Sequence, residues 1–540
     1  MDQRRFLLAL VLSFLLLLAY EQLVVRPYRQ APVSPKQEQA PGRGAEAPRV
    51  ERPPAPPEHP PSAETSRTLG GGELGASADD LPTVTVETDV IRATITTRGA
   101  RLKSLELKQF RQTVQHDSPP LDLVRASPVL PVTMEFGAGS SDASVEYTAS
   151  TQALVVRGAD QGEVSFRGTT PGGALLEKRY RFPGNSYVFD VELSGPAAKG
   201  TVGLVLTPIS EQGTSGGRTP GHELAVAFAN TKVIEKSIDS LDKAVEVPGS
   251  SWTGFSAQYF AALTMPASGT ATAWLEKTDL LPITRLEALG GDGRASFQVF
   301  LGPKERDVLA AAGHQLDRVL DFGWFWFIAV PLLWGLRALY RVIPNYGVAI
   351  ILLTGIVKLV TAPLTRSSFK SMKAMQKLQP EMQRLRERHK DDQVTMQKEM
   401  MELYKRHRVN PVSGCLPMLL QLPIFVGLYN ALMHAIELRH APFMLWINDL
   451  SAPDRLMIGG IGIPVLVLVM GASMLLQQWM TPQQGDPTQQ RMMMIMPVVF
   501  TFISINFPSG LVLYWLVNNL LSMGQQWYML RSDDGGARAA

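Results

Sequence analysis

Apolar runs and alternating segments occupy separate parts of this 540-residue chain. The first apolar run, Phe6 to Ala19, follows Arg4 and Arg5 near the N-terminus. Secretory signal peptides and membrane anchors share this arrangement. Because no small-x-small cleavage site follows the run closely, we predict an uncleaved signal-anchor helix at residues 1–25. Its arginines resist translocation and therefore place the N-terminus in the cytoplasm.

Five further apolar runs lie in the C-terminal part of the chain. They are Tyr346–Leu364, Leu416–Ile436, Ile458–Met480, Met492–Phe507 and Leu511–Leu530. A membrane-spanning helix needs about 20 predominantly apolar residues, so each run is predicted to cross the bilayer. Met492–Phe507 is short for a span, and short spans thin the bilayer locally. Together with the anchor, these runs predict a polytopic α-helical membrane protein of six transmembrane helices, five of which form a core at residues 344–540.

The apolar segment at residues 319–343 is expected to be an amphipathic helix that lies in the membrane interface. It contains three tryptophans and two arginines, which is typical of interfacial helices. Chain orientation gives the stronger argument. The loop from Arg366 to Arg408 carries twelve Lys and Arg residues, and short basic loops stay cytoplasmic. If residues 346–364 enter the cytoplasm, the preceding segment cannot also cross, so both termini are predicted to be cytoplasmic.

Between residues 81 and 318 the pattern changes to an alternation with period two. Thr83–Glu87 and Tyr187–Leu193 are examples of short alternating segments bounded by turn residues. Many such segments without intervening helical patterns predict an exported all-β domain, an antiparallel β-sandwich. We find no nucleophile–base pair, metal-ligand cluster or phosphate loop in its sequence. Residues 26–80 are rich in proline and charge and are predicted to be a disordered linker.

Bulk composition conceals this segregation. The net charge of +3 and the mean hydropathy of +0.02 suit neither a pure membrane bundle nor a nucleic-acid binder. The single cysteine, Cys415, excludes an intramolecular disulfide and lacks the neighbouring ligands that a zinc site needs. The exported domain must therefore be stabilised by its core alone.

One ionisable residue, Lys358, lies inside a predicted span. It is about 12 Å from Arg366 along a helix that rises 1.5 Å per residue. An intramembrane cation costs at least about 2.5–3.5 kcal/mol and normally faces a partner or water. Thr354 and Thr361 share its helix face, and the other predicted spans contain no Asp or Glu. A hydrated pocket with one unpaired positive charge is therefore favoured, and snorkelling of the lysine to the headgroups is the alternative.

Polar residues also recur every three to four positions along the last predicted span. They are Tyr514, Trp515, Asn518, Asn519, Ser522, Gln525 and Gln526, and the facing spans add Gln421, Tyr429, Asn430, Ser473, Gln477 and Ser504. Polar side chains can simply hold membrane helices together. A stripe of this length favours a hydrophilic cavity that contains Lys358 and opens to the cytoplasm and to lipid.

The basic loop at residues 366–410 is predicted to form a cytoplasmic antiparallel helical hairpin. Its apolar stripes are Met372, Met375, Leu378, Met382 and Leu385 in one arm, and Met396, Met400, Met401, Leu403 and Tyr404 in the other. Asp392 can cap the second helix, and Pro380 predicts an irregularity in the first. The methionines either form a core or contact varied apolar partners. The basic residues either set the topology or touch anionic lipid or ribosomal RNA.

Four motifs in the C-terminal part resemble the signatures of the YidC membrane-protein insertases, of the YidC/Oxa/Alb family. They are Asn410–Pro417, Gln421–Phe425, Ala441–Ile447 with Asp449–Ser451, and Phe507–Tyr514. Thr88–Gly99 and Gln258–Phe260 resemble the periplasmic domain of Gram-negative members. The resemblance implies a periplasmic β-supersandwich domain, an interfacial helix and five core helices around a hydrophilic groove, all at the bacterial inner membrane.

The resemblance also implies an insertase and chaperone for integral membrane proteins that is not an enzyme. A groove that opens to the cytoplasm would receive the hydrophilic part of a substrate, and the hairpin would receive the incoming chain. The groove residues are Lys358, Thr354, Thr361, Gln421, Tyr514, Trp515, Asn518 and Ser522, and the hairpin residues are Met372, Met375, Met382, Met400 and Tyr404. No cofactor, ATP, metal or small-molecule substrate is expected. The expected partners are nascent membrane proteins, Sec translocon components, the ribosome and the phospholipid bilayer, with insertion either independent of Sec or together with it.

Two positions depart from the family pattern. The groove cation of the family is usually arginine, whereas Lys358 keeps the charge but lacks the planar fork. The usual tyrosine pair is here Tyr514 and Trp515, which lacks one hydroxyl. A secondary transporter or channel with a β-sandwich ectodomain is the alternative function, although the sequence shows neither internal repeats nor mid-membrane carboxylates. A scaffold for translocon components is a third.

Overall fold

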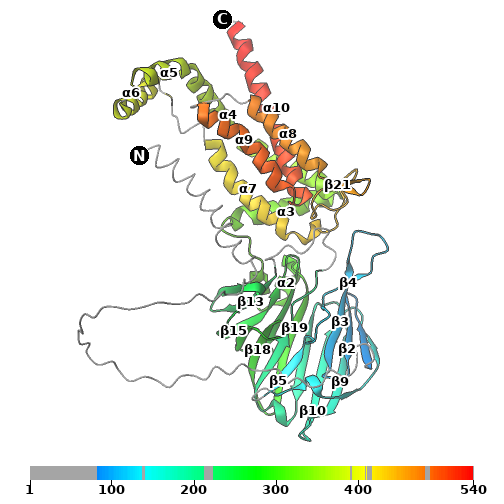
Figure 1. Ribbon diagram of the computed structural model, residues 1–540. Coiled ribbons are helices and arrows are strands. Elements are labelled where there is room, and N and C mark those ends of the chain that lie inside the picture. The colour runs from blue at the N-terminus through cyan, green and yellow to red at the C-terminus, as the bar shows by residue number, and fades with distance from the viewer. Residues whose placement is uncertain are drawn as a thin grey trace, which may run out of the picture. The chain divides into compact units, whose positions relative to one another are not determined.

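The computed structural model describes residues 82–538, apart from 137–139, 212–222, 390–391, 408, 410–415 and 481–486. The predicted anchor at 1–25 and the predicted linker at 26–80 lie outside the described residues. In the described chain, nineteen strands come first, and a mainly helical part with one short β-hairpin follows (Figure 1). This order matches the predicted combination of a β-rich domain and a helical core.

Two sheets build the β domain. The five-stranded sheet has the order β4-β3-β2-β1-β8. Its strands are β1 (Thr83–Glu87), β2 (Ile91–Thr96), β3 (Arg101–Arg111), β4 (Pro120–Asp122) and β8 (Ala153–Val155). The 14-stranded sheet has the order β6-β5-β12-β18-β17-β15-β16-β19-β11-β10-β9-β7, with β13 between β14 and β15. Its strands are β5 (Thr133–Phe136), β6 (Ser140–Ser141), β7 (Tyr147–Ala149), β9 (Gln161–Thr169), β10 (Leu175–Pro183), β11 (Val188–Ser194), β12 (Gly200–Leu206), β13 (Leu224–Ala229), β14 (Lys232–Ser237), β15 (Val245–Ser256), β16 (Phe260–Pro266), β17 (Ala271–Lys277), β18 (Pro282–Gly290) and β19 (Arg294–Pro303).

Period-two alternation explains how these strands form one core. In β10 the side chains of Leu176, Lys178, Tyr180 and Phe182 are buried, and those between them are partly or fully exposed. Such alternation buries one face of each strand and leaves the other to solvent. The buried faces of both sheets join in a single apolar cluster, so the domain is a sandwich without disulfides.

The β domain differs from the predicted antiparallel, all-β sandwich at two points. Strand β1 pairs with β8 in parallel, because the chain reaches β8 only after passing through strands of the other sheet. After β19 come a short helix, α2 (Arg306–Ala312), and a 3-10 helix, η6 (Leu316–Val319). Leu309 and Leu316 from these helices are buried in the sandwich core. These helices therefore belong to the packing of the β domain.

Eight α-helices and one 3-10 helix, η8 (Ile436–Leu438), follow in the described part of the chain. The α-helices are α3 (Trp326–Val342), α4 (Tyr346–Lys377), α5 (Gln379–Arg388), α6 (Gln393–Arg406), α7 (Leu416–His434), α8 (Val465–Met480), α9 (Pro487–Ser504) and α10 (Ser509–Arg538). Helices α3, α4, α7, α8, α9 and α10 pack as one bundle (Figure 1). It has its own apolar core, which includes Leu353, Leu432, Val467 and Leu513.

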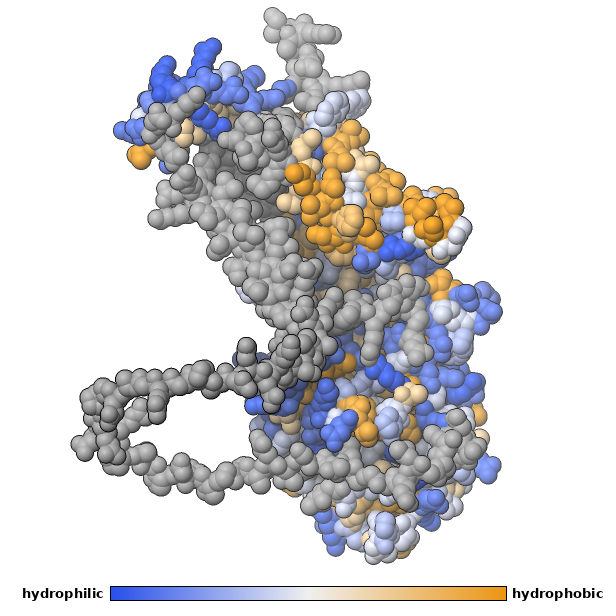
Figure 2. Space-filling model, in the orientation of Figure 1, coloured by the Kyte–Doolittle hydropathy of each residue, from blue (hydrophilic) through white to orange (hydrophobic). Residues whose placement is uncertain are grey.

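Apolar side chains also cover the outside of this bundle (Figure 2). Val469 on α8 and Phe502 on α9 are examples, at 49% and 76% exposure. By length and composition, one described helix, α4, is able to cross a membrane, and Val465–Met480 and Met494–Asn506 are shorter apolar helices. A helical bundle that is apolar both inside and outside fits a lipid environment.

The apolar run Ile458–Met480 is not one helix, as the sequence had suggested. Its first part belongs to a β-hairpin of β20 (Leu456–Ile458) and β21 (Ile461–Ile463). Gly459 and Gly460 form the two-residue turn with φ of +58° and +85°, a conformation that glycine adopts at little cost. Helix α8 begins only at Val465. The Gly-Gly pair between apolar residues is the signal in the sequence that predicts this hairpin.

Helix α4 continues well beyond the predicted span, to Lys377. Helix α5 then begins at Gln379 with Pro380 in its first turn, where the missing proline N–H leaves no helical hydrogen bond unmade. The first arm of the hairpin is therefore broken at Leu378, close to Pro380, which is the irregularity that the sequence predicted. The predicted cap of α6 is confirmed, since Asp392 accepts hydrogen bonds from the backbone N–H groups of Val394 and Thr395, both at 3.1 Å.

Candidate functional site in the helical bundle

Lys358 lies between α4 and α10. Its Nζ donates a hydrogen bond to Ser522 Oγ at 2.8 Å, and Ser522 Oγ donates to the carbonyl oxygen of Asn518 at 2.7 Å. Among the described residues, no carboxylate pairs with Lys358. The ammonium group is thus held by a neighbouring helix, which favours the predicted polar site over snorkelling, and its charge has no fixed counter-ion there.

The two threonines predicted beside Lys358 contribute less than their positions suggest. Thr354 Oγ1 donates to the carbonyl oxygen of Ile350 at 2.6 Å, and Thr361 Oγ1 donates to that of Val357 at 3.0 Å. Such bonds to the preceding helical turn are a common local partner for threonine hydroxyls. Both hydroxyl groups therefore donate their protons within α4, and they can only accept a hydrogen bond from a ligand.

Tyr514 and Gln421 meet between α10 and α7. Gln421 Nε2 donates to Tyr514 Oη at 2.7 Å, and Tyr514 is fully buried in the bundle core. A buried tyrosine hydroxyl normally needs such a partner. The structure therefore brings two of the predicted groove residues into direct contact, as a hydrogen bond that joins two helices.

Trp515 belongs to an aromatic cluster with residues from two other helices. Its ring stacks on Phe425 of α7, with centroids 4.9 Å apart, and meets Phe500 of α9 edge-on at 4.4 Å. The sequence reasoning missed both phenylalanines as site residues, although each lies in a predicted span. The cluster supplies a rigid apolar wall where the family pattern has a second tyrosine hydroxyl.

The predicted polar stripe on α10 is divided between different neighbours. Ser522 faces Lys358 on α4, whereas Asn519 donates to Ser473 Oγ on α8 at 3.3 Å and Gln526 donates to the carbonyl oxygen of Met480 at 2.8 Å. The idea of one continuous polar face was therefore wrong for these two residues. They hold α8 and α10 together, the role that polar side chains often have between membrane helices.

The hairpin methionines are mainly internal. Met375, Leu378 and Tyr404 are buried together, with Met382 and Met400 packed against them, and Tyr404 Oη lies 3.7 Å from the sulfur of Met382. The side chain of Met372 lies outside the described residues. Among the described side chains of the hairpin, the exposed large apolar ones are instead Val394 and Met401, at 80% and 52% exposure.

Comparisons with known proteins cover both parts of the described chain. The family model "60Kd inner membrane protein" matches residues 338–535, and the model "YidC periplasmic domain" matches residues 83–335. The membrane protein insertase YidC of Geobacter metallireducens is 39% identical over 98% of each chain. That of Syntrophus aciditrophicus is 37% identical over 98% of this chain and 99% of its own. A solved structure of an active YidC insertase is 21% identical, covers 83% of this chain and 94% of its own, and has a TM-score of 0.38.

These matches and the fold define an inner-membrane protein with a helical membrane core and a β-rich periplasmic domain. More particularly, the chain belongs to the YidC family of membrane protein insertases, which are not enzymes. The family and the function predicted from the four C-terminal motifs are thereby confirmed.

Proposed function

We propose that this insertase receives the hydrophilic part of a nascent membrane protein in a groove between α4, α7 and α10, open to the cytoplasm. The observation that carries the proposal is Lys358, a cation inside a span whose described hydrogen-bond partner is the neutral hydroxyl of Ser522. A positive charge in a region of low dielectric attracts an anionic segment more strongly than it would in water. Lys358 would therefore attract acidic tails that must cross.

The groove would hold the polar segment while the apolar segment of the substrate enters lipid. Asn518 and Ser522 are partly exposed and would offer hydrogen-bonding groups beside Lys358. Trp515 with Phe425 and Phe500 would form the apolar wall. Tyr514, Gln421, Thr354 and Thr361 would maintain the spacing of the helices around the groove.

This mechanism needs the topology predicted from the sequence. We propose six transmembrane helices, cytoplasmic termini, a cytoplasmic hairpin and a periplasmic β domain, with α3 in the outer interface. The basic content of residues 366–408 supports this orientation. The exposure of Trp324, Trp326 and Trp334, at 92%, 61% and 72%, supports placing this segment among the headgroups.

Substitution of Lys358 tests the charge directly in proteoliposomes that contain the full chain. Lys358→Glu is expected to lower insertion of a substrate with an acidic exported tail by more than about tenfold, about 1.4 kcal/mol. A matched substrate with a neutral tail should be affected much less, and Lys358→Arg should retain activity on both. Lys243→Glu makes the same charge change at an exposed position of the β domain and is the control. Equal insertion by wild type and Lys358→Glu would remove the charge from the mechanism.

The hairpin is proposed to receive the incoming chain, alone or with the ribosome and Sec translocon components. Its exposed Val394 and Met401 support this role more directly than its buried methionines. A photocrosslinker at Val394 should capture a stalled nascent chain, whereas one at the buried Tyr404 should not. Capture from Tyr404 alone would show that the hairpin opens before it binds.

A further inference from the structure

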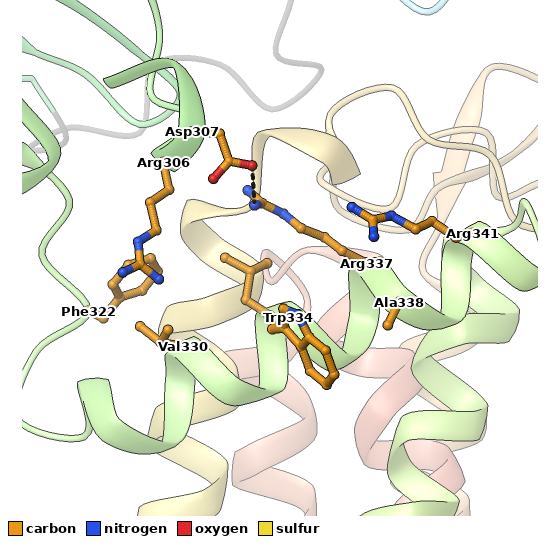
Figure 3. A pocket seen from close by; sticks show the side chains of 9 residues that line it. Arg306, Asp307, Phe322, Val330, Trp334, Arg337, Ala338 and Arg341 are labelled. Carbon is orange, nitrogen blue, oxygen red and sulfur yellow. Dashed lines mark ion pairs between the residues drawn. The ribbon is translucent and has the colours of Figure 1, made fainter. Parts of the chain in front are cut away.

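A basic pocket lies between α2 of the β domain and α3 (Figure 3). Its volume is about 260 Å³. Arg306 and Asp307 reach it from α2, and Arg337 and Arg341 reach it from α3. Val330 and Trp334 of α3 supply apolar lining. The pocket therefore places guanidinium groups beside a surface suited to hydrocarbon.

The charges around this pocket do not balance. Asp307 is the single carboxylate among its described lining residues, and its side chain is 82% exposed and 3.7 Å from Arg337. Arg337 is paired more closely with Glu437, at 2.5 Å. Among the described residues, Arg306 and Arg341 have no ion-pair partner, and both are exposed. Two guanidinium groups at the pocket thus remain available to an anion.

The expected depth of the pocket in the membrane interface indicates which anion it binds. Trp334 lines it and is 72% exposed, and Trp326 on the same helix is 61% exposed. Tryptophan is enriched where lipid headgroups meet hydrocarbon, and arginine binds phosphate through paired N–H groups. An anion that carries acyl chains satisfies both the arginines and the apolar lining, which free phosphate does not.

We propose that this pocket is a binding site for the phosphate of an anionic phospholipid headgroup in the outer leaflet. Arg341 binds the phosphodiester at one end of the pocket, and Arg306, on the other side of the Asp307–Arg337 pair in Figure 3, adds positive charge at the opposite end. Arg337, already paired, defines the inner wall. An acyl chain lies along Val330 and Trp334. The site rests on the proposed periplasmic side of α3, and by bridging α2 and α3 the lipid couples the β domain to the membrane.

The test uses the full chain in phosphatidylcholine nanodiscs that contain a trace of photoactivatable phosphatidylglycerol. We expect crosslinks in peptides from α2 and α3. Arg306→Gln with Arg341→Gln should reduce this labelling by roughly twenty-five-fold, because each basic residue near an anionic lipid surface is worth about a factor of five. The control pair, Arg294→Gln with Arg318→Gln, removes two exposed arginines outside the pocket and should leave labelling unchanged.

Three outcomes would overturn the proposal. They are undiminished labelling in the Arg306→Gln, Arg341→Gln variant, equal labelling by photoactivatable phosphatidylcholine, and loss of labelling on adding inorganic phosphate at low millimolar concentration. The last would identify a site for free phosphate. Wild-type protein provides a measurement without mutation, since labelling should weaken as salt rises from about 50 mM to about 500 mM. Lipid labelling does not depend on insertion activity, so failure here is distinguishable from failure of the groove mechanism.

Discussion

Two lysines, one in each part of the molecule, show how differently the two parts treat a positive charge. In the β domain, Lys178 donates to Asp142 Oδ2 at 2.7 Å and to the carbonyl oxygens of Val132 and Gly99 at 2.6 and 3.0 Å. Both charged side chains are completely buried. In the helical bundle, Lys358 donates to a single described neutral acceptor, Ser522.

The difference separates a structural charge from one that can act on a substrate. An ammonium group has three donors, and Lys178 has an acceptor for each, one of them a carboxylate. Lys178 therefore has neither charge nor hydrogen-bonding capacity to offer a ligand. Lys358 keeps both, and its partial exposure allows a ligand to reach it. Burial of a charge does not indicate function by itself, whereas burial without a counter-charge does.

The largest expected effect comes from breaking the paired lysine. Lys178→Met leaves Asp142 as an uncompensated buried carboxylate and should destabilise the β domain by about 3–5 kcal/mol. Chemical unfolding of the purified chain, followed through β-domain fluorescence, measures this loss. The double variant Lys178→Met, Asp142→Leu removes both charges and should recover most of the stability. An unchanged midpoint for Lys178→Met would show that the ion pair does not stabilise the domain.

The same substitution at Lys358 should not destabilise the protein, in contrast to Lys178→Met. Lys358→Met removes an intramembrane cation that costs at least about 2.5–3.5 kcal/mol on insertion scales. The thermal midpoint in detergent should therefore stay constant or rise. Insertion of substrates with acidic tails should fall severalfold in proteoliposomes. A variant that is both destabilised and inactive would mean that Lys358, like Lys178, is a structural residue.

A smaller effect is expected from the one described partner of Lys358. Ser522→Ala removes a neutral hydrogen bond worth about 0.5–1.5 kcal/mol, while the charge remains. Insertion of acidic-tail substrates should change by less than about fivefold, with the preference for acidic over neutral tails preserved. Ser504→Ala is the matched control, because that buried hydroxyl bonds within α9 to the carbonyl oxygen of Phe500 at 2.7 Å. A loss of tail preference in Ser522→Ala would assign orientation of the lysine to this bond.

The sequence predicted Lys358 because charge is rare in an apolar run, but it did not predict Lys178. The signal for Lys178 exists, since Leu176, Tyr180 and Phe182 occupy the inward positions of the same alternating strand. Its partner Asp142 lies in a different short element, 36 residues earlier in the chain. Local periodicity shows that a side chain is buried, but only the tertiary fold shows what compensates its charge.

The helices show the same limit. Apolar runs located the membrane helices, because lipid requires about 20 apolar residues in any sequence context. The run Ile458–Met480 misled because apolar residues occur in strands as well as helices, and only its Gly-Gly pair marks the turn. On α10, helical spacing identified the polar residues. Their division between α4 and α8 depends on how the helices cross, which spacing along one helix does not encode.

A third lysine, Lys304, is buried in the β domain and gives a prediction about pH dependence. It donates to the carbonyl oxygen of Ala257 at 2.9 Å. Burial lowers the pKa of Lys304 to about 8, although Glu211 opposes the shift. Below pH 8 the folded protein must keep a buried ammonium charged, whereas between pH 8 and about 10.5 the unfolded chain binds more protons than the folded one. The stability contribution of this group therefore rises with pH in that window.

Lys304→Met should remove the rise, measured as the pH dependence of the β-domain unfolding midpoint against wild type. If the unfolding midpoints of the two proteins changed with pH in parallel, Lys304 would titrate in the folded state as it does in the unfolded chain. The comparison of charges in the two parts of the molecule would then rest on Lys178 and Lys358.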